Sequence, residues 1–583
     1  MRSARGVAAW CATTVVVALT AVAGSPGRAS ADPEPRPVLL RTVQAAAAKA
    51  KAMGRGTAAA QAELEDAGAP AVVAGGVHTC ALTLGVFSDD TSLWCWGGNG
   101  AGQLGIGGTA AESLVPVRVN AVAPLAGVDL IGADAGAAHT CAAAVGGALY
   151  CWGSNAQGQL GTGGPGEERR PVPVPGVTDV AAVATGQEHT CAVTDVGSVW
   201  CWGRNDAGQL GTGSLAASAG TPQPVGGLVG ITGIAAHEHN TCVVDAGGDA
   251  WCWGSDADGQ LGDAGAATTS RVPVQVDESG IGDPFLDQVD VGRRHACAVD
   301  DEGAAYCWGD DSAGQLGDGG AATDSPMPVP VAAGERLFVR VDAGDDTTCG
   351  LEIFVVSCWG DNTRGRLGTG DVANRETPAG IANGEMRPTP FLGPLFGLAS
   401  ALLIGVDTSG GHTCAVEILG SVYCWGANDA GQLGDRTRVD NAAPVRTSLS
   451  PDPVTGVRLA ARDRALAVSW QAPADPGATP VVAYAALALA DTGEGCGTFG
   501  ARSCVIPGLV NGTRYPVFVL AGTVAGISIS DVAYGTPTGG GAGAGLPITG
   551  SPLRAQSAVA VALLIIGAVG LWTARRRRIR FTA

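Results

Sequence analysis

A short sequence beginning Cys-Trp-Gly recurs seven times along this chain. The copy at 151–161 reads CWGSNAQGQLG, and related copies begin at Cys95, Cys201, Cys252, Cys307, Cys358 and Cys424. A partner cysteine precedes each copy, at Cys80, Cys141, Cys191, Cys242, Cys297, Cys349 and Cys414. Repeats spaced roughly 50 to 65 residues apart are supersecondary units that bury their apolar faces only by packing on neighbours. The sequence therefore predicts a repeat architecture.

The two cysteines of a unit define the register of a hairpin. If Cys191 and Cys201 oppose each other on antiparallel strands, the chain turns through residues 195–197. Such a loop favours a left-handed third residue, which glycine adopts without strain. The third residue is Gly197 here, and the same register gives Gly147, Gly248, Gly303 and Gly420 in four other units.

Directly opposed strand residues lie close enough for a disulfide. The register therefore predicts seven bridges, namely Cys80–Cys95, Cys141–Cys151, Cys191–Cys201, Cys242–Cys252, Cys297–Cys307, Cys349–Cys358 and Cys414–Cys424. Two units deviate, because the first has a longer insertion between its cysteines and the sixth is one residue shorter and lacks the loop glycine.

Large aromatic side chains flank the second cysteine of most units. Trp200 and Trp202 lie on either side of Cys201, so they share the opposite face of that strand. The pattern recurs as Tyr150/Trp152, Trp251/Trp253, Tyr306/Trp308 and Tyr423/Trp425. Neighbouring sheets would bury such a ladder between them. Seven units of short strands predict an all-β fold, a closed seven-bladed β-propeller over residues 71–448.

These motifs resemble the regulator of chromosome condensation repeat family, and in particular its bacterial secreted members, which include a β-lactamase-inhibitor protein. The resemblance covers about residues 70 to 448 and implies the same propeller fold. Unit six departs from the pattern with Arg366 in place of glutamine, and unit four has Asn240 in place of histidine. Nucleotide exchange and chromatin binding in the eukaryotic relatives need an intracellular partner, and the export signal described below argues against both.

A different pattern follows the repeats. Residues 451–537 resemble a fibronectin type III β-sandwich, with Trp470 as the core residue of an early strand and Tyr515 as the corner tyrosine. Both roles are structural. Cys496 and Cys504 are predicted to bridge.

The N-terminus predicts export. Arginines, an apolar run and the small residues Ala29-Ser30-Ala31 have the order of a signal peptide, which we place at 1–31. Residues 32–70 form an N-terminal arm with no assigned role.

The C-terminus predicts attachment to a cell wall. A Gly-rich spacer at 538–545 precedes Leu546-Pro547-Ile548-Thr549-Gly550, a transmembrane segment at 558–574 and a basic cytoplasmic tail at 575–583. This arrangement resembles the L-P-x-T-G sorting signal of Gram-positive surface proteins. The resemblance implies that sortase cuts after Thr549 and joins it to peptidoglycan, so that Leu546, Pro547, Thr549 and Gly550 are processing residues and the membrane tail is transient. A plain tail anchor is the alternative.

The charge of the chain restricts its partners. Basic residues number 35 and acidic residues 54, a net charge of −19. Removal of the signal peptide with its three arginines, and of the released tail with its six, leaves 26 basic residues and a net charge of −28. A strongly acidic surface disfavours nucleic acid and anionic lipid.

Candidate chemistry is sparse. All seven histidines lie in the repeats: His78, His139, His189, His237, His239, His295 and His412. Zinc binding by the His-x-Cys pattern is one hypothesis, and a structural histidine that bonds a neighbouring turn is the favoured one. Acidic turns such as 256–258 and 310–312 match calcium ligands, but ordinary Asx turns are favoured. We predict no catalytic residues, no bound metal and no cofactor.

The function predicted from these features is a wall-anchored binding or adhesion scaffold. It would recognise an extracellular protein or glycan through propeller loops, and insertions near 216–225 and 383–403 are the candidate loops. The alternative is an inhibitor of an extracellular enzyme such as a β-lactamase. A structural wall component and a hydrolase are less favoured, because no nucleophile, acid and base converge in the sequence.

Overall fold

The computed structural model describes residues 71–539, except 85–90, 122, 283, 321, 335, 353–354, 387–402, 418–419 and 489–493. The predicted signal peptide, N-terminal arm, sorting motif, membrane segment and basic tail, and most of the predicted spacer, lie outside these residues. Within them, no helix is long and apolar enough to span a membrane.

The described chain begins with seven four-stranded antiparallel sheets, each built from four consecutive strands. We call them blades 1 to 7. Blade 1 comprises β1 Ala71–Ala74, β2 His78–Leu84, β3 Thr91–Gly98 and β4 Glu112–Arg118; blade 2, β5 Leu130–Ala135, β6 His139–Ala144, β7 Leu149–Gly153 and β8 Glu168–Pro173; blade 3, β9 Val180–Thr185, β10 His189–Thr194, β11 Val199–Arg204 and β12 Ser218–Pro224.

The remaining blades continue the pattern. Blade 4 comprises β13 Ile231–His237, β14 Asn240–Asp245, β15 Ala250–Ser255 and β16 Thr269–Gln275; blade 5, β17 Leu286–Val291, β18 His295–Asp300, β19 Ala305–Gly309 and β20 Ser325–Pro330; blade 6, β21 Arg340–Ala343, β22 Thr347–Leu351, β23 Val356–Gly360 and β24 Arg375–Gly380; blade 7, β25 Leu403–Ser409, β26 His412–Glu417, β27 Val422–Gly426 and β28 Asn441–Arg446. Two single-turn 3₁₀ helices lie in connections, η1 Glu278–Gly280 and η2 Thr363–Gly365.

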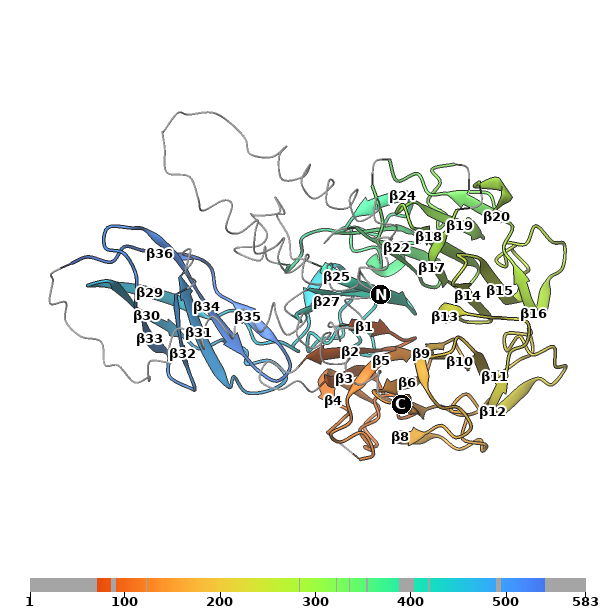
Figure 1. The fold of residues 1–583 in the computed structure, drawn as a ribbon, viewed down its shortest axis with the longest axis horizontal. Helices are drawn as coiled ribbons and strands as arrows, with labels where there is room; N and C mark the ends of the chain where they lie inside the picture. Colours follow the sequence, from red (N-terminus) through yellow and green to blue (C-terminus); the bar gives the residue numbers. More distant parts are fainter. Residues whose placement is uncertain are drawn as a thin grey trace, which may run out of the picture.

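The blades form a closed ring. The first strand of each blade contacts the first strand of the next, and β25 contacts β1, so these strands are innermost (Figure 1). The Asp407 carboxylate in blade 7 accepts a hydrogen bond from the Ala74 backbone N–H in blade 1 at 2.9 Å. The fold is therefore all-β and propeller-like, as the repeat pattern predicts.

The hairpin register is the one that the cysteines predict. Cys191 opposes Cys201 in blade 3, and Gly197 in the turn has a φ of 75°. Disulfides join the two central strands of every blade, with Cα–Cα distances of 4.0–4.1 Å: Cys80–Cys95, Cys141–Cys151, Cys191–Cys201, Cys242–Cys252, Cys297–Cys307, Cys349–Cys358 and Cys414–Cys424.

The aromatic ladder packs between blades, and its two members differ. The tryptophan after each second cysteine is fully buried in all seven blades, at Trp96, Trp152, Trp202, Trp253, Trp308, Trp359 and Trp425. The aromatic before it is only half-buried in blades 2 to 5, as at Trp200. Trp202 packs in a cluster with Leu160 and Val174 of blade 2, so the buried tryptophan fills the space between adjacent blades.

Two further sheets follow the ring and pack face to face. One has the order β29-β30-β33, and the other has the order β32-β31-β34-β35, with β36 paired to β34. Their strands are β29 Thr455–Arg462, β30 Ala465–Gln471, β31 Ala483–Ala488, β32 Gly495–Thr498, β33 Ser503–Ile506, β34 Tyr515–Gly522, β35 Ile527–Ile529 and β36 Ala533–Gly535. The Cys496–Cys504 disulfide connects β32 in one sheet to β33 in the other.

The two predicted structural residues of this region have the expected surroundings. Trp470 is buried in the core between the sheets, 5.5 Å from Tyr484 measured between ring centroids. The Tyr515 hydroxyl accepts a hydrogen bond from the Val510 backbone N–H at 3.0 Å. Ala525 of this region packs with Leu449 against the side of blades 7 and 1 (Figure 1).

Candidate binding face

The repeated histidines join adjacent blades. The Nε2 atom of His189 in blade 3 lies 2.9 Å from the Thr241 hydroxyl in blade 4. That hydroxyl donates its single hydrogen to the backbone carbonyl of Gln209, so the histidine must donate to the threonine. Four other histidines make the same contact with the next blade: His78 with Thr140, His139 with Thr190, His295 with Thr348 and His412 with Thr79.

These five imidazoles are neutral and structural. Burial lowers the pKa of His78, His189 and His295 to about 3 and that of His139 and His412 to about 4. The zinc hypothesis finds no support, because the cysteines are bridged and the histidines bind threonines. Among the described residues, no three His, Cys, Asp or Glu side chains form a group suited to a metal. The favoured hypothesis named the right role, although the partner is a strand residue and not a turn.

The same carbonyls also hold the tryptophan ladder. The indole Nε1 of Trp202 donates to the Gln159 carbonyl of the preceding blade at 2.9 Å, and Thr190 donates to that carbonyl as well. In blade 6 the residue that supplies the carbonyl is Arg366, which still accepts from Trp425 at 2.8 Å. The glutamine-to-arginine change is therefore tolerated because the contact uses the main chain.

The acidic turns are held by bonds from backbone N–H groups to aspartate side chains, and one is an Asx turn, in which Asp310 accepts from the Ser312 N–H two residues later at 3.1 Å. Asp256 and Asp311 each accept a hydrogen bond from the backbone N–H five residues later, on Leu261 and Leu316, at 3.0 Å. Asparagine does the same in the other five blades: Asn99, Asn155, Asn205, Asn362 and Asn428. Calcium is not needed to explain these residues.

One end of the propeller carries an uneven distribution of charge. In each antiparallel blade, the turn between strands one and two and the turn between strands three and four lie at the same end, which we call the turn face. The first of these turns contains only small or apolar residues in blades 1, 2 and 7, at 75–77, 136–138 and 410–411. In blades 3 to 6, the turn between strands one and two contains charged residues. About half of the turn face is therefore charged around the inner strands.

We define the charged cluster as His237, Glu238, Arg293, Arg294, Asp345 and Asp346. Its members come from three successive blades. His237 of blade 4 bonds Asp345 of blade 6 at 3.1 Å, which spans the turn of blade 5. Arg293 of that turn pairs with Asp346 at 2.8 Å.

The second arginine of the cluster extends it outward along the turn face. Arg294 pairs with Asp310 of the same blade at 2.7 Å. Both arginine side chains remain more than a third exposed. The cluster is therefore accessible to a partner.

Electrostatics favours a charged His237. Burial alone would lower its pKa, but the hydrogen bond and charge of Asp345, with the charge of Glu238, raise it above the ordinary value. The partner carboxyl of Asp345 is also partly buried, which opposes ionisation, yet its bond to His237 lowers its pKa to about 2. The ionised Asp345 carboxylate therefore favours the protonated form of His237, beside the two guanidiniums of the cluster.

Sequence reasoning missed this cluster, and one of its candidate loops was wrong. Residues 216–225, expected as a recognition loop, mostly form β12, the outer strand of blade 3. The second candidate loop, at 383–403, lies mostly outside the described residues, because 387–402 are not among them; Asn383 to Met386 are described. An alignment of the seven first turns would have separated the charged turns from the uncharged ones.

Comparison with known families fits the repeated blades. A family model described as "RCC1-like domain" matches residues 45–387, and a second, described as "Regulator of chromosome condensation (RCC1) repeat", matches residues 420–461. The chain belongs to the RCC1-like domain family. Its four-stranded blades, buried tryptophans and inter-blade carbonyl contacts are therefore features of an RCC1-like propeller.

Relatives of this RCC1-like chain have diverse functions. It is 30% identical over 415 residues to the Ultraviolet-B receptor UVR8 of Arabidopsis thaliana, covering 69% of this chain and 88% of the receptor. It is also 30% identical over 355 residues to the E3 ubiquitin-protein ligase HERC2 of Homo sapiens, which covers 59% of this chain but only 7% of that ligase.

Solved structures support the fold alone. Human WBSCR16 aligns with a TM-score of 0.51 and 23% identity, over 60% of this chain and 86% of that chain. Yeast RCC1 (Prp20), in a complex with Kap60, aligns with a TM-score of 0.50 and 21% identity, over 58% and 78%. RCC1-like propellers mediate protein binding or regulation.

Proposed function

We propose that this RCC1-like protein is an exported, wall-anchored scaffold that binds a protein partner through the turn face. The charged cluster carries the proposal. Its two arginines are more than a third exposed and pair with less exposed aspartates, and exposed charge of this kind orients a charged partner and favours rapid association. A glycan is the alternative ligand. The inhibitor alternative is not favoured.

No catalytic role is proposed. The polar groups of the turn face are engaged in ion pairs and in contacts between blades, so they position loops and present charge. HERC2 is a ligase, but this chain matches only 7% of it, so that activity is not carried over.

We also propose how the scaffold is displayed. The two-sheet region is a fibronectin type III domain, supported by the buried Trp470 and by the hydrogen bond of Tyr515 to the chain upstream. Sortase would join Thr549 to peptidoglycan, and the domain with its spacer would hold the propeller away from the wall. Peptide mass spectrometry of wall digests tests this: a C-terminal peptide ending at Thr549 supports anchoring, and a peptide containing the arginine-rich tail contradicts it.

A charge swap within the cluster tests binding through the turn face. The double variant R293E/D346R keeps an ion pair between blades 5 and 6 but exchanges the positions of the two charges. We expect loss of partner capture from culture by the purified full chain, with unchanged thermal unfolding. The matched control is D195R on an exposed turn at the opposite end of blade 3. Equal capture by both variants contradicts the proposal.

A further inference from the structure

Neighbouring blades meet at seven equivalent junctions toward the outer part of the turn face, which we call grooves. In each, a backbone N–H in the loop that leads to the fourth strand donates to a carbonyl at the start of the next blade's fourth strand. The residues that supply this carbonyl are Leu114, Arg169, Gly220, Arg271, Pro326, Glu376 and Ala442. The backbone contact repeats seven times while the side chain above it changes, so this position gives each groove its own chemistry.

Two of the grooves are filled by an arginine of the protein itself. Arg169 of blade 2 donates from Nη2 to the carbonyl of Gly100 at 2.8 Å and from Nη1 to those of Asn99 and Gly108 at 3.4 Å. Arg271 of blade 4 donates in the same way to the carbonyls of blade 3 at 3.2–3.3 Å, which belong to Asn205, Asp206 and Ser214. The acceptors occupy equivalent positions in the two blades, so the groove is a repeated guanidinium-binding site.

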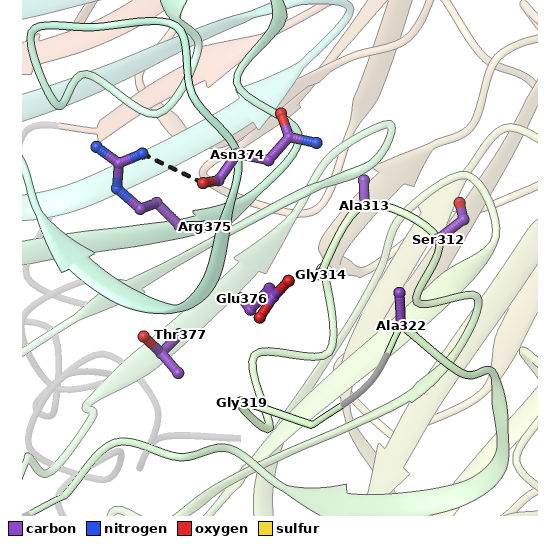
Figure 2. Close-up of a pocket in the computed structure, with 9 residues that line it drawn as sticks. All are labelled: Ser312, Ala313, Gly314, Gly319, Ala322, Asn374, Arg375, Glu376 and Thr377. Atoms are coloured by element: carbon purple, nitrogen blue, oxygen red, sulfur yellow. Dashed lines mark hydrogen bonds between the residues drawn. The ribbon is translucent and has the colours of Figure 1, made fainter.

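The groove between blades 5 and 6 is distinguished by Glu376, because it alone of the seven residues named above carries a carboxylate. The Cγ of Glu376 lies beside Gly314, as the Cγ of Arg271 lies beside Gly208. The ionised carboxylate of Glu376, however, cannot donate hydrogen bonds to carbonyls. A cavity of about 400 Å³ opens there. It is lined by Ser312, Ala313, Gly314, Gly319, Ala322, Asn374, Arg375, Glu376 and Thr377 (Figure 2).

The arginine beside this cavity does not fill it. Arg375 pairs with Asp371 at 2.6 Å and donates to the Ala373 and Asn374 carbonyls, and its guanidinium points away from the blade 5 loop (Figure 2). The carbonyls equivalent to those bound by Arg169 belong here to Asp311, Ser312 and Gly320. The described structure therefore contains an open copy of a groove that the same chain fills twice with its own guanidinium.

We propose that this groove binds the guanidinium of an arginine side chain on the partner protein. A guanidinium presents a planar set of N–H donors that matches several convergent acceptors, whereas an ammonium offers a single point of charge. The exposed Glu376 carboxylate adds a charge opposite to that of a bound guanidinium, as Glu167 does for Arg169 at 3.5 Å. The inference deepens the proposed function, since it names one group that a protein partner would present to the turn face.

Saturation-transfer NMR on the full chain with n-propylguanidine tests the proposal directly. The neutral isostere n-propylurea is the matched probe. We expect millimolar binding of the guanidine and at least tenfold weaker binding of the urea. The variant E376R should lose guanidine binding, because its own side chain fills the groove as Arg169 and Arg271 do. E376Q keeps the shape, and its affinity should fall by about threefold.

An internal control comes from opening a filled groove. R271A should gain a second guanidine site, and propylguanidine should raise its Tm more than that of the wild type. Absence of guanidine-selective binding in the wild type, or its persistence in E376R, overturns the inference. If E376R still captures the partner as well as wild type while R293E/D346R does not, this groove is refuted and the proposed function stands.

Discussion

Two blades carry an aspartate where five carry an asparagine, and this difference predicts a measurable gain in stability. The side-chain oxygen accepts from a leucine N–H in all seven blades. The asparagine also uses its amide, as when Asn205 donates Nδ2 to the Ala216 carbonyl at 2.9 Å. Asp256 and Asp311 have no such donor when ionised. Burial raises the pKa of each to about 6, because the charged form loses hydration.

The magnitude follows from that pKa. An aspartate whose pKa rises from about 4 in the unfolded chain to about 6 would cost about 3 kcal/mol of stability at high pH. Both carboxyls lie close beneath the surface, and solvent screening reduces the cost to about 1 kcal/mol each. The double variant D256N/D311N should therefore be more stable by about 2 kcal/mol at pH 8.

The sign of the pH dependence is definite. A raised carboxyl pKa means that the folded state binds protons more tightly, so the penalty is absent below about pH 4, grows between about pH 4 and pH 6, and is constant at higher pH. Urea unfolding should show little gain in the free energy of unfolding at about pH 4 and the full gain at about pH 8, where thermal unfolding should show a Tm higher by about 2 °C. N155D is the reverse control and should lose stability only at high pH. An equal gain at both pH values would refute the assigned cause.

Three further predictions test contacts within the fold. Blade 4 lacks the repeated histidine and blade 5 lacks its threonine, so N240H/A296T should create the histidine–threonine hydrogen bond between these blades. A double-mutant cycle by urea unfolding should show a favourable coupling of about 1 kcal/mol. Because contact with Asp345 raises the pKa of His237, H237Q should cost about 1 kcal/mol at pH 5.5 and less at pH 8.5, and a constant cost would contradict this ion pair. Y515F removes the acceptor for the Val510 N–H and should cost about 1 kcal/mol, measured by thermal unfolding of the full chain.

The features that the sequence predicted well are local ones. A disulfide across a hairpin depends on a register of about ten residues, and the loop glycine tests that register independently. The pairing of Cys191 with Cys201 and the left-handed Gly197 could therefore be predicted from one unit. The seven repeats then restrict the architecture to a closed ring.

The features that the sequence did not reveal depend on how blades meet. The contact between His189 and Thr241 joins residues of different blades, and no pattern within one unit names the partner. The charged cluster joins His237 to Asp345 across an intervening blade, so its members are separated by more than one repeat. The open groove beside Glu376 becomes visible only when equivalent positions of all seven blades are compared in space.

Photo-cross-linking on intact cells tests the central claim, partner binding through the turn face, most directly. A photoactivatable residue would replace Gln187, which is exposed in the first turn of blade 3 on the turn face, in one strain and Val196, which is 76% exposed at the opposite end of blade 3, in another. We predict a discrete adduct with one partner protein from position 187 and none from position 196. An adduct from position 196 alone, or equal labelling from both positions, would contradict binding through the turn face.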